Sequence, residues 1–242
     1  MKSLNNKSLY ILLICLLFSA CKKSEDDKVS IEKTLSSFTI LNLQSSFDVY
    51  LVQDTLFKII LEGDEKIVTK INLSYNDSIL TIKNDAKLSW LSPKNNKIKL
   101  TIHLNGLKKI IADETCYITS QNTLKADELG IIMSSKLNEA DLTIDCNTFY
   151  YWNNQPCGGR LRLHGRTYQL KVWNFALMAV DASDLNADRV LVENSSKGDC
   201  RVKALSEIEY SIFGEGNIYL YGNPLSINLK EITSTGKFIR IY

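Results

Sequence analysis

The strongest constraint on the fold of this chain is an apolar pattern that returns about every twenty residues over its second half. The rows of this pattern start at Ile110, Leu129, Phe149, Leu170, Val190, Ile208 and Ile227. The successive steps are 19, 20, 21, 20, 18 and 19 residues. A sustained period of this length is typical of stacked repeats, in which each row packs only on its neighbours. The similar stretches LKADELGIIMSSKLN (124–138) and LNADRVLVENSSKGD (185–199) are therefore rows three turns apart.

The rows also alternate between apolar and polar residues. In RVLVEN, Val190 and Val192 are expected to point one way and Leu191 and Glu193 the other. Twenty residues are too few for a strand, a crossover helix and their loops, but they suffice for two or three short strands with tight bends. We therefore predict an all-β chain whose rows stack as a parallel β-helix-like solenoid. An antiparallel β-sandwich with hairpins of similar spacing is the alternative.

Three asparagines occupy the same position in consecutive rows: Asn153, Asn174 and Asn194. An inward-facing amide is costly to bury unless it is hydrogen-bonded. Stacked at strand spacing, each side chain can donate to a carbonyl in the next row, as in asparagine ladders. The sequence therefore predicts a structural ladder at one bend, ended by apolar caps at Met133 and Ile212.

The region before the repeat consists of short apolar or alternating runs separated by Asn, Asp, Gly and Ser. SYNDSILTI predicts a hairpin with its turn at Asn76–Asp77. DAKLSWLSPKNN (85–96) predicts a longer loop, with Trp90 packed back onto the body. We expect one domain over 38–242, with N-terminal strands and hairpins over 38–106 and repeat rows over 107–242.

The N-terminus has the pattern of a bacterial lipoprotein signal. Lys2 and Lys7 precede the ten-residue apolar run LYILLICLLF, which is too short to span a bilayer. FSAC then places small residues before Cys21, which resembles a lipobox. The expectation is a signal peptide over 1–20, a lipid on Cys21 and a polar tether over 21–37. An ordinary secretory signal cut near Ala20 is the alternative.

The location follows from this signal. KKSEDDK after Cys21 resembles the export tag of surface-exposed lipoproteins in the Bacteroidetes group. The alternative is a plain solvated tether, because charged residues without apolar ones do not collapse into a core. We expect an outer-membrane lipoprotein, surface-exposed or otherwise periplasmic-facing, held to the membrane through Cys21.

The composition of the chain limits the partners and cofactors that we expect. Lys and Arg number 29 against 27 Asp and Glu, so no nucleic-acid partner is indicated. The spacing of Cys116, Cys146, Cys157 and Cys200 matches no zinc module. These cysteines either form disulfides in an oxidising compartment or remain buried thiols. No metal or other cofactor is expected.

Several stretches resemble a known family. FDVYLVQ, LEGDEKIV, DSILTIK and IKLTIHLNGLKKI are similar to the first half of the "putative auto-transporter adhesin, head GIN domain" family, common in Bacteroidetes lipoproteins. LKADELGI, LNADRVLV and GEGNIYLYGNP resemble its second half. The resemblance covers about Phe38 to Tyr242 and implies a fold similar to a parallel β-helix. It brings no ligand and no catalytic residues with it.

The chain departs from that family at its bends. The family repeats a Gly-x-Gly bend in nearly every row, but here only Gly214 and Gly216 keep both glycines. The corresponding pairs elsewhere are Ser196/Gly198, Ser135/Leu137 and Ala176/Met178. We expect several bends to tolerate a β-carbon or to differ in shape.

No catalytic constellation is recognisable, and we expect no enzyme. His103 and His164 are the only histidines, and no nucleophile elbow, P-loop or zinc-protease motif occurs. The sequence favours a non-enzymatic, adhesin-like binding or scaffolding domain in the cell envelope. The alternatives are a β-helix enzyme acting on polysaccharide and an envelope regulatory or sensor module.

Two surface features are candidates for a ligand or partner such as a glycan or an envelope protein. Tyr150 and Trp152 are expected to share a face with Trp173 of the next row, as an aromatic platform. The strand GGRLRLHGR aligns four basic side chains: Arg160, Arg162, His164 and Arg166. A covered platform and a basic strand paired with acids on the next row are the alternatives. Because the two features lie in adjacent rows, they could form one site.

Overall fold

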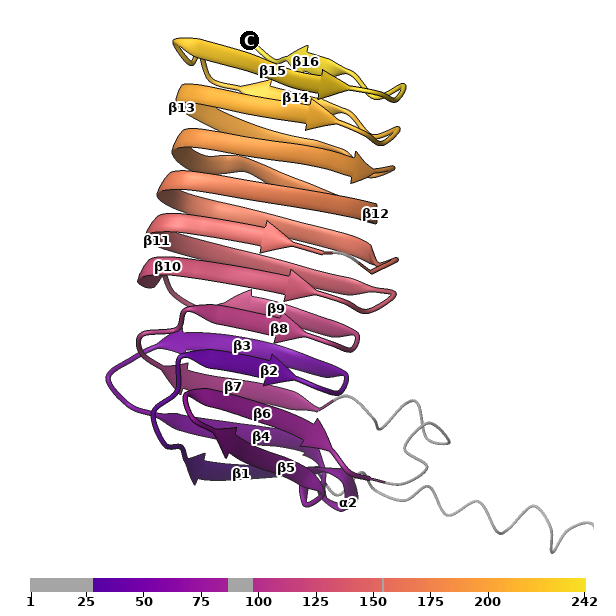
Figure 1. The fold of residues 1–242 in the computed structure, drawn as a ribbon. Coiled ribbons are helices and arrows are strands. Elements are labelled where there is room, and N and C mark those ends of the chain that lie inside the picture. Colours follow the sequence, from indigo (N-terminus) through magenta and orange to yellow (C-terminus); the bar gives the residue numbers. More distant parts are fainter. Residues whose placement is uncertain (1–27, 87–97, 154) are drawn as a thin grey trace, which may run out of the picture.

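The computed structural model describes residues 28–86, 98–153 and 155–242. The chain winds into an elongated column of stacked turns, with the N-terminal strands at one end and the C-terminal strands at the other (Figure 1). The strands pair mostly in parallel with those of the turns before and after. The predicted all-β solenoid is therefore confirmed, and the sandwich alternative is not favoured.

Each turn contributes one strand segment to each of two faces of the column. The strands of one face run in the opposite direction to those of the other (Figure 1). The first face stacks β5 (Ile71–Asn76), β6 (Ile79–Asn84), β2 (Ile40–Leu43), β8 (Lys109–Ala112) and the second half of β10 (Leu124–Met133). The second face stacks β1 (Lys28–Thr34), β4 (Lys58–Asp64), β7 (Lys99–Leu104), β3 (Phe47–Gln53) and β9 (Cys116–Ser120).

Later strands are long because they continue around the bend between the faces. They are β11 (Asn138–Trp152), β12 (Gly158–Ser196) and β13 (Cys200–Ile212). The column ends with β14 (Ile218–Tyr221) and β16 (Phe238–Arg240) on the second face and β15 (Ser226–Ile232) on the first.

The strand register follows the predicted rows with one exception. Phe149 pairs with Leu129 and Leu170, and Ile208 pairs with Val190 and Ile227, as the row starts require. The first row start is wrong, because Ile110 pairs with Ile131 rather than Leu129. Both Leu129 and Ile131 point inward, so a shift of two residues keeps the in–out pattern and cannot be detected from it.

The core lies between the two faces. Inward side chains such as Val190 and Val192 are buried, whereas Leu191 and Glu193 are only partly covered, as predicted. Each buried Val or Leu contributes about 1.5–3 kcal/mol relative to an exposed side chain. Because every turn adds its inward residues to the same column, the core is continuous from β2 to β14.

The N-terminal boundaries differ from the predicted ones. β2 and β3 already pair in parallel with β8 and β9, so the stack begins near Ile40 rather than at 107. Residues 28–34, expected in the tether, form β1, which pairs antiparallel with β4. Val29 and Ile31 pack on the core from this strand, and their alternation with polar residues is too short to distinguish a strand from a tether.

Antiparallel strands close this end of the column. β5 and β6 form the predicted hairpin, but its turn is Asp77–Ser78, one residue later than expected. Asp77 adopts the left-handed conformation at φ 52°, which Asp tolerates in such turns. The short helix α2 (Glu65–Val68) follows β4 and buries Ile67 and Val68.

Some predictions concern residues outside the described ranges. These are the signal peptide over 1–20, Cys21 with its lipid, the start of the tether and the packing of Trp90.

Candidate functional site

Two tryptophans on the first face lie side by side. Trp152 of β11 pairs in register with Trp173 of β12, and both side chains point outward from adjacent turns. Trp152 is 41% exposed, and so is Phe175 at the following bend. With Glu193 and Ser195 they line a groove of about 240 Å³, which we call the tryptophan groove.

Buried asparagines hold the bend beside the tryptophan groove. Asn153 Nδ2 donates to the Phe175 carbonyl at 3.0 Å, and the Phe175 backbone N–H donates to Asn153 Oδ1 at 2.9 Å. Two hydrogen bonds from one fixed side chain thus position the exposed Phe175 ring. Ala176 has φ 63°, so this bend carries a β-carbon in the left-handed conformation.

The three asparagines of the predicted ladder are buried at 3%, 1% and 0% exposure, and each donates toward the next turn. Asn153 reaches the Phe175 carbonyl, Asn174 reaches Asn194 Oδ1 at 3.0 Å, and Asn194 reaches the Gly216 carbonyl at 3.0 Å. Only one of these contacts joins two amides, so most of the column bonds to backbone. Met133 and Ile212, at its two ends, are fully buried.

Tyr150 does not line the tryptophan groove. It lies on β11 opposite Gly130 of the preceding turn and Lys171 of the following one. A β-carbon on Gly130 would fall 2.0 Å from the Tyr150 ring, so this ring rests on the glycine of its neighbour. The predicted platform therefore consists of Trp152 and Trp173 without Tyr150.

The basic strand lies on the second face and is largely neutralised. Arg166 makes two hydrogen bonds to Asp145, at 2.8 and 2.9 Å, and holds the pKa of that carboxyl below its usual value. His164 Nε2 lies 3.0 Å from Asp141 Oδ1, and Arg162 lies 3.9 Å from the same carboxylate. The partner acids come from the adjacent turn.

The suggestion of a single combined site is wrong. Trp152 pairs with Ile132 of β10 on the first face, whereas Arg160 pairs with Glu139 of β11 on the second, so these two exposed residues lie on opposite faces. Adjacency of rows along the sequence does not reveal this, because each row crosses both faces.

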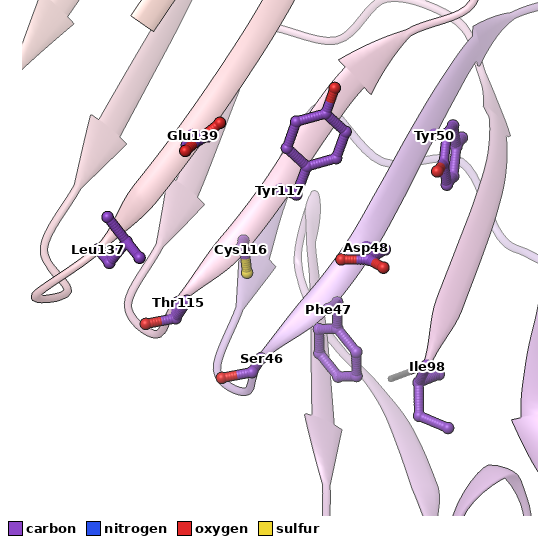
Figure 2. Close-up of a pocket in the computed structure, with 10 residues that line it drawn as sticks. All are labelled: Ser46, Phe47, Asp48, Tyr50, Ile98, Thr115, Cys116, Tyr117, Leu137 and Glu139. Carbon is purple, nitrogen blue, oxygen red and sulfur yellow. The ribbon is translucent and has the colours of Figure 1, made fainter. Parts of the chain in front are cut away.

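A larger groove, of about 580 Å³, lies on the second face and had no clear signal in the sequence (Figure 2). Its outward side chains are Asp48 of β3, Tyr117 of β9 and Glu139 of β11, which are opposite one another in consecutive strands. We call it the acidic groove. Tyr50, Leu137, Ile98, Phe47 and Cys116 complete the apolar part of its lining, and Ser46 and Thr115 add hydroxyls at the bends.

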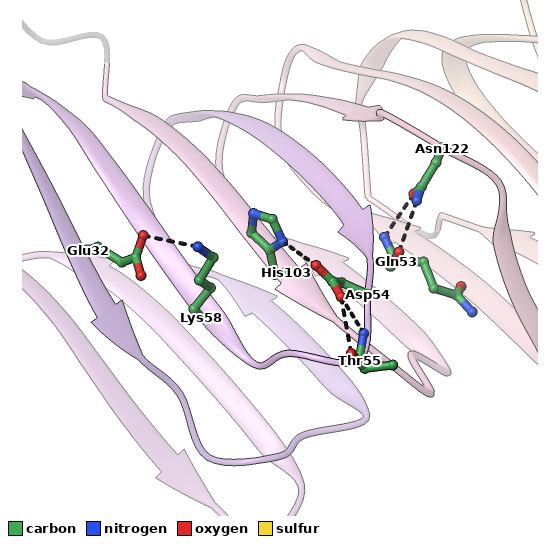
Figure 3. A network of polar contacts seen from close by, with 7 residues as sticks. All are labelled: Glu32, Gln53, Asp54, Thr55, Lys58, His103 and Asn122. Carbon is green, nitrogen blue, oxygen red and sulfur yellow. Dashed lines mark hydrogen bonds and ion pairs between the residues drawn. The ribbon is translucent and has the colours of Figure 1, made fainter.

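His103 is a partner in a polar contact rather than a free base. Its Nδ1 lies 3.0 Å from Asp54 Oδ2, which lowers the pKa of the Asp54 carboxyl (Figure 3). Nearby, the Gln53 backbone N–H donates to Asn122 Oδ1 at 2.8 Å, and Asn122 Nδ2 donates to the Gln53 carbonyl at 2.9 Å. These contacts join the turns at the end of β3.

All four cysteines in the described ranges are buried free thiols. Burial raises the pKa of the Cys116 and Cys200 thiols to about 12. It also raises the pKa of the Cys146 and Cys157 thiols. Asn153 donates a hydrogen bond to the Cys157 sulfur at 2.8 Å, so this thiol is part of the bend structure.

We expect these thiols to be unreactive in the native protein because all four are buried. At pH 7 a thiol with a pKa of about 12, as at Cys116 and Cys200, is ionised in only about one molecule in 10⁵. Ellman's reagent, applied to the chain from Ser24 onward, should detect almost no thiol in buffer. In guanidinium without reductant it should detect all four. Detection of two or none in guanidinium would show instead that disulfides form.

Over the described ranges, no helix is long and apolar enough to cross a membrane. Within the same ranges, no three His, Cys, Asp or Glu side chains are grouped so that they could hold a metal ion.

Solved structures of bacterial proteins share this fold. A "putative adhesin" from Bacteroides fragilis has a TM-score of 0.80 at 19% identity, covering 90% of this chain and 98% of that chain. A "putative lipid binding protein" from Parabacteroides distasonis has a TM-score of 0.64 at 16% identity, covering 89% and 97%. At such identities the likeness shows the fold alone.

Among curated proteins there is no match. The family model "Putative auto-transporter adhesin, head GIN domain" matches residues 37–224. This range includes the tryptophan groove, the asparagine column and every turn of the stack as far as β14. The chain therefore belongs to the head GIN domain family of auto-transporter adhesin-like proteins.

Proposed function

We propose that this chain is a non-enzymatic, adhesin-like module of the cell envelope that binds a sugar ring in the tryptophan groove. The observation that carries the proposal is that the exposed Trp152 pairs in register with the partly exposed Trp173, beside the exposed Phe175. Membership of an adhesin family supports the general class of function.

The chemistry of the groove suits a pyranose. Two neighbouring indole rings offer a flat apolar surface on which the C–H face of a sugar can stack. Strand spacing puts the two residues about 4.8 Å apart along the column, so the platform extends over adjacent turns. The Glu193 carboxylate and the Ser195 hydroxyl line the same groove and can accept hydrogen bonds from sugar hydroxyls.

A glycan array tests this proposal. The chain from Ser24 onward, which keeps every described residue, should bind a limited set of glycans. A Trp152→Ala/Trp173→Ala variant should lose at least about 90% of the signal, because stacking contributes about 0.5–1.5 kcal/mol per ring beyond the burial of its surface. Tyr168→Ala removes an aromatic ring that is 49% exposed elsewhere and is the matched control. If the double variant binds glycans as well as the unmodified chain, the tryptophan groove is not the sugar-binding site.

We propose that the module is anchored as an outer-membrane lipoprotein through Cys21, facing the cell surface. The support is the sequence alone: a short apolar run followed by FSAC and a charged segment. Metabolic labelling with a palmitate analogue should mark the full chain and not Cys21→Ser. Labelling of both proteins, or of neither, would contradict lipid attachment at this residue.

An enzyme acting on polysaccharide has one observation in its favour. Asp48 and Glu139 flank the acidic groove two strand spacings apart, about 10 Å between backbones, and glycosidases use paired carboxyl groups. We nevertheless propose that the module does not cleave its ligand. Release of reducing ends from a bound polysaccharide, lost in Glu139→Gln, would overturn this.

A sensor module that docks through the end of the column also has one observation in its favour. Among the strands of the described ranges, β15 and β16 each pair with a strand on one side only, and Leu229 is 53% exposed. However, a register shift in β15 and the charge of Lys230 are features that hinder strand addition at a sheet edge. We therefore favour the tryptophan groove over this edge.

A further inference from the structure

We propose that the acidic groove is a second binding site, which takes a lysine side chain from an extended segment of a partner protein. This goes beyond sugar binding in the tryptophan groove, lies on the other face and uses none of the same residues. The inference rests on the arrangement of Asp48, Tyr117 and Glu139 across three adjacent strands (Figure 2).

The charge of this groove is unbalanced. Within 4 Å, no Lys, Arg or His of the described residues forms an ion pair with Asp48 or Glu139. Lys99 is opposite Asp48 and Arg160 is opposite Glu139 on the flanking strands, but neither makes such a pair. Lys99 pairs with Glu62 instead, at 2.8 Å. The groove therefore has two carboxylates available to an incoming cation.

The walls of the groove suit the rest of a lysine side chain. Leu137 is 53% exposed and Tyr117 is 38% exposed, and the buried Phe47 and Ile98 complete the apolar lining. An aliphatic stem can cover such apolar surface while its ammonium group meets a carboxylate. A related contact lies beside the groove, where Lys99 Nζ is 5.2 Å from the centre of the Tyr50 ring.

Non-specific attraction is a poor explanation for lysine binding here. The chain from Ser24 onward lacks Lys2, Lys7, Lys22 and Lys23 and carries 25 basic against 27 acidic side chains, a formal net charge of −2, so its overall attraction for a cationic peptide is weak. A peptide segment is preferred to a free amine because the groove crosses several strands and offers its carboxylates at two separate points. Its hydroxyl side chains, Ser46 and Thr115, can hydrogen-bond to peptide groups.

The test is fluorescence anisotropy with a fluorescein-labelled hexapeptide of alternating lysine and serine. The same peptide with every lysine acetylated is the control ligand. The chain from Ser24 onward should bind the lysine peptide at least about tenfold more tightly than the acetylated one. Asp48→Asn/Glu139→Gln should lose at least about tenfold in affinity. Arg160→Gln, which removes a nearby cation, should bind as tightly as the unmodified chain or more so.

The matched control is Asp127→Asn/Glu128→Gln, which removes the same charge from two exposed residues outside the groove. It should bind the lysine peptide with unchanged affinity, and thermal melting should show that both double variants fold. Equal affinity for the acetylated peptide, or for Asp48→Asn/Glu139→Gln, would overturn the proposal. Displacement of the peptide by glucosamine at lower concentration than by lysine amide would overturn the choice of a protein partner.

The experiments distinguish a failure of lysine binding in the acidic groove from a failure of sugar binding in the tryptophan groove. The glycan array reports on Trp152 and Trp173, and the peptide titration reports on Asp48 and Glu139. Neither pair of substitutions touches the other groove.

Discussion

Asn194→Ala is expected to lower the free energy of unfolding by about 3 kcal/mol. Asn194 Oδ1 accepts from Asn174 Nδ2 at 3.0 Å and from the Ser196 backbone N–H at 3.3 Å. Its Nδ2 donates to the carbonyls of Gly198 at 3.1 Å and Gly216 at 3.0 Å. Alanine removes all four bonds; Asn174 Nδ2 keeps its bond to the Met178 carbonyl at 2.8 Å, but the Ser196 N–H and the two carbonyls lose this partner. Each unsatisfied buried group costs about 1–3 kcal/mol. Urea unfolding followed by circular dichroism measures the change.

The matched control is Asn186→Ala, at an exposed residue whose side chain bonds to no residue in the described ranges. It should change the stability by no more than about 0.5 kcal/mol. If Asn194→Ala costs as little as Asn186→Ala, the asparagine column does not hold the bends together.

Gly159→Ala should be still more damaging, with a loss of at least about 4 kcal/mol or a failure to fold. Gly159 has φ 120°, a conformation that residues with a side chain rarely adopt. A β-carbon there would fall 1.9 Å from the carbonyl oxygen of Asn138, its register partner on the preceding turn. The clash is with backbone, so no rotation of a side chain relieves it. Soluble yield and thermal melting report the effect.

Gly106→Ala separates the clash from the backbone conformation. Gly106 also has positive φ, at 66°, but an added β-carbon would meet nothing within 4 Å. The cost should be only the penalty for left-handed backbone, about 1–2 kcal/mol. Equal losses in the two variants would mean that close approach between turns is not what requires glycine at 159.

The periodic parts of the fold could be predicted from the sequence for a physical reason. Inward positions such as Val190 and Val192 must be apolar in every turn, because each turn buries its side chains against the next. The first and last residues of the strands near the N-terminus are harder to predict from the sequence. β1 pairs antiparallel and alternates only weakly, so Val29 and Ile31 looked like part of a polar tether.

The site was only partly predictable. Trp152 and Trp173 are one turn apart, so the period alone brings them together. Asp48 and Glu139 are 91 residues apart in the sequence and meet through β9, so their proximity depends on a register that no local pattern contains. The assignment of faces also required the structure, because it depends on where each bend reverses the chain.

The most direct test of the central claim is a fluorescence titration of the tryptophan groove. The chain has three tryptophans, and Trp90→Phe leaves only Trp152 and Trp173 to emit. The glycan with the strongest array signal should shift or quench this emission along a saturable curve, with the affinity found by calorimetry. Heat of binding without any change in tryptophan emission would contradict the account, since the ligand would then bind away from both indoles.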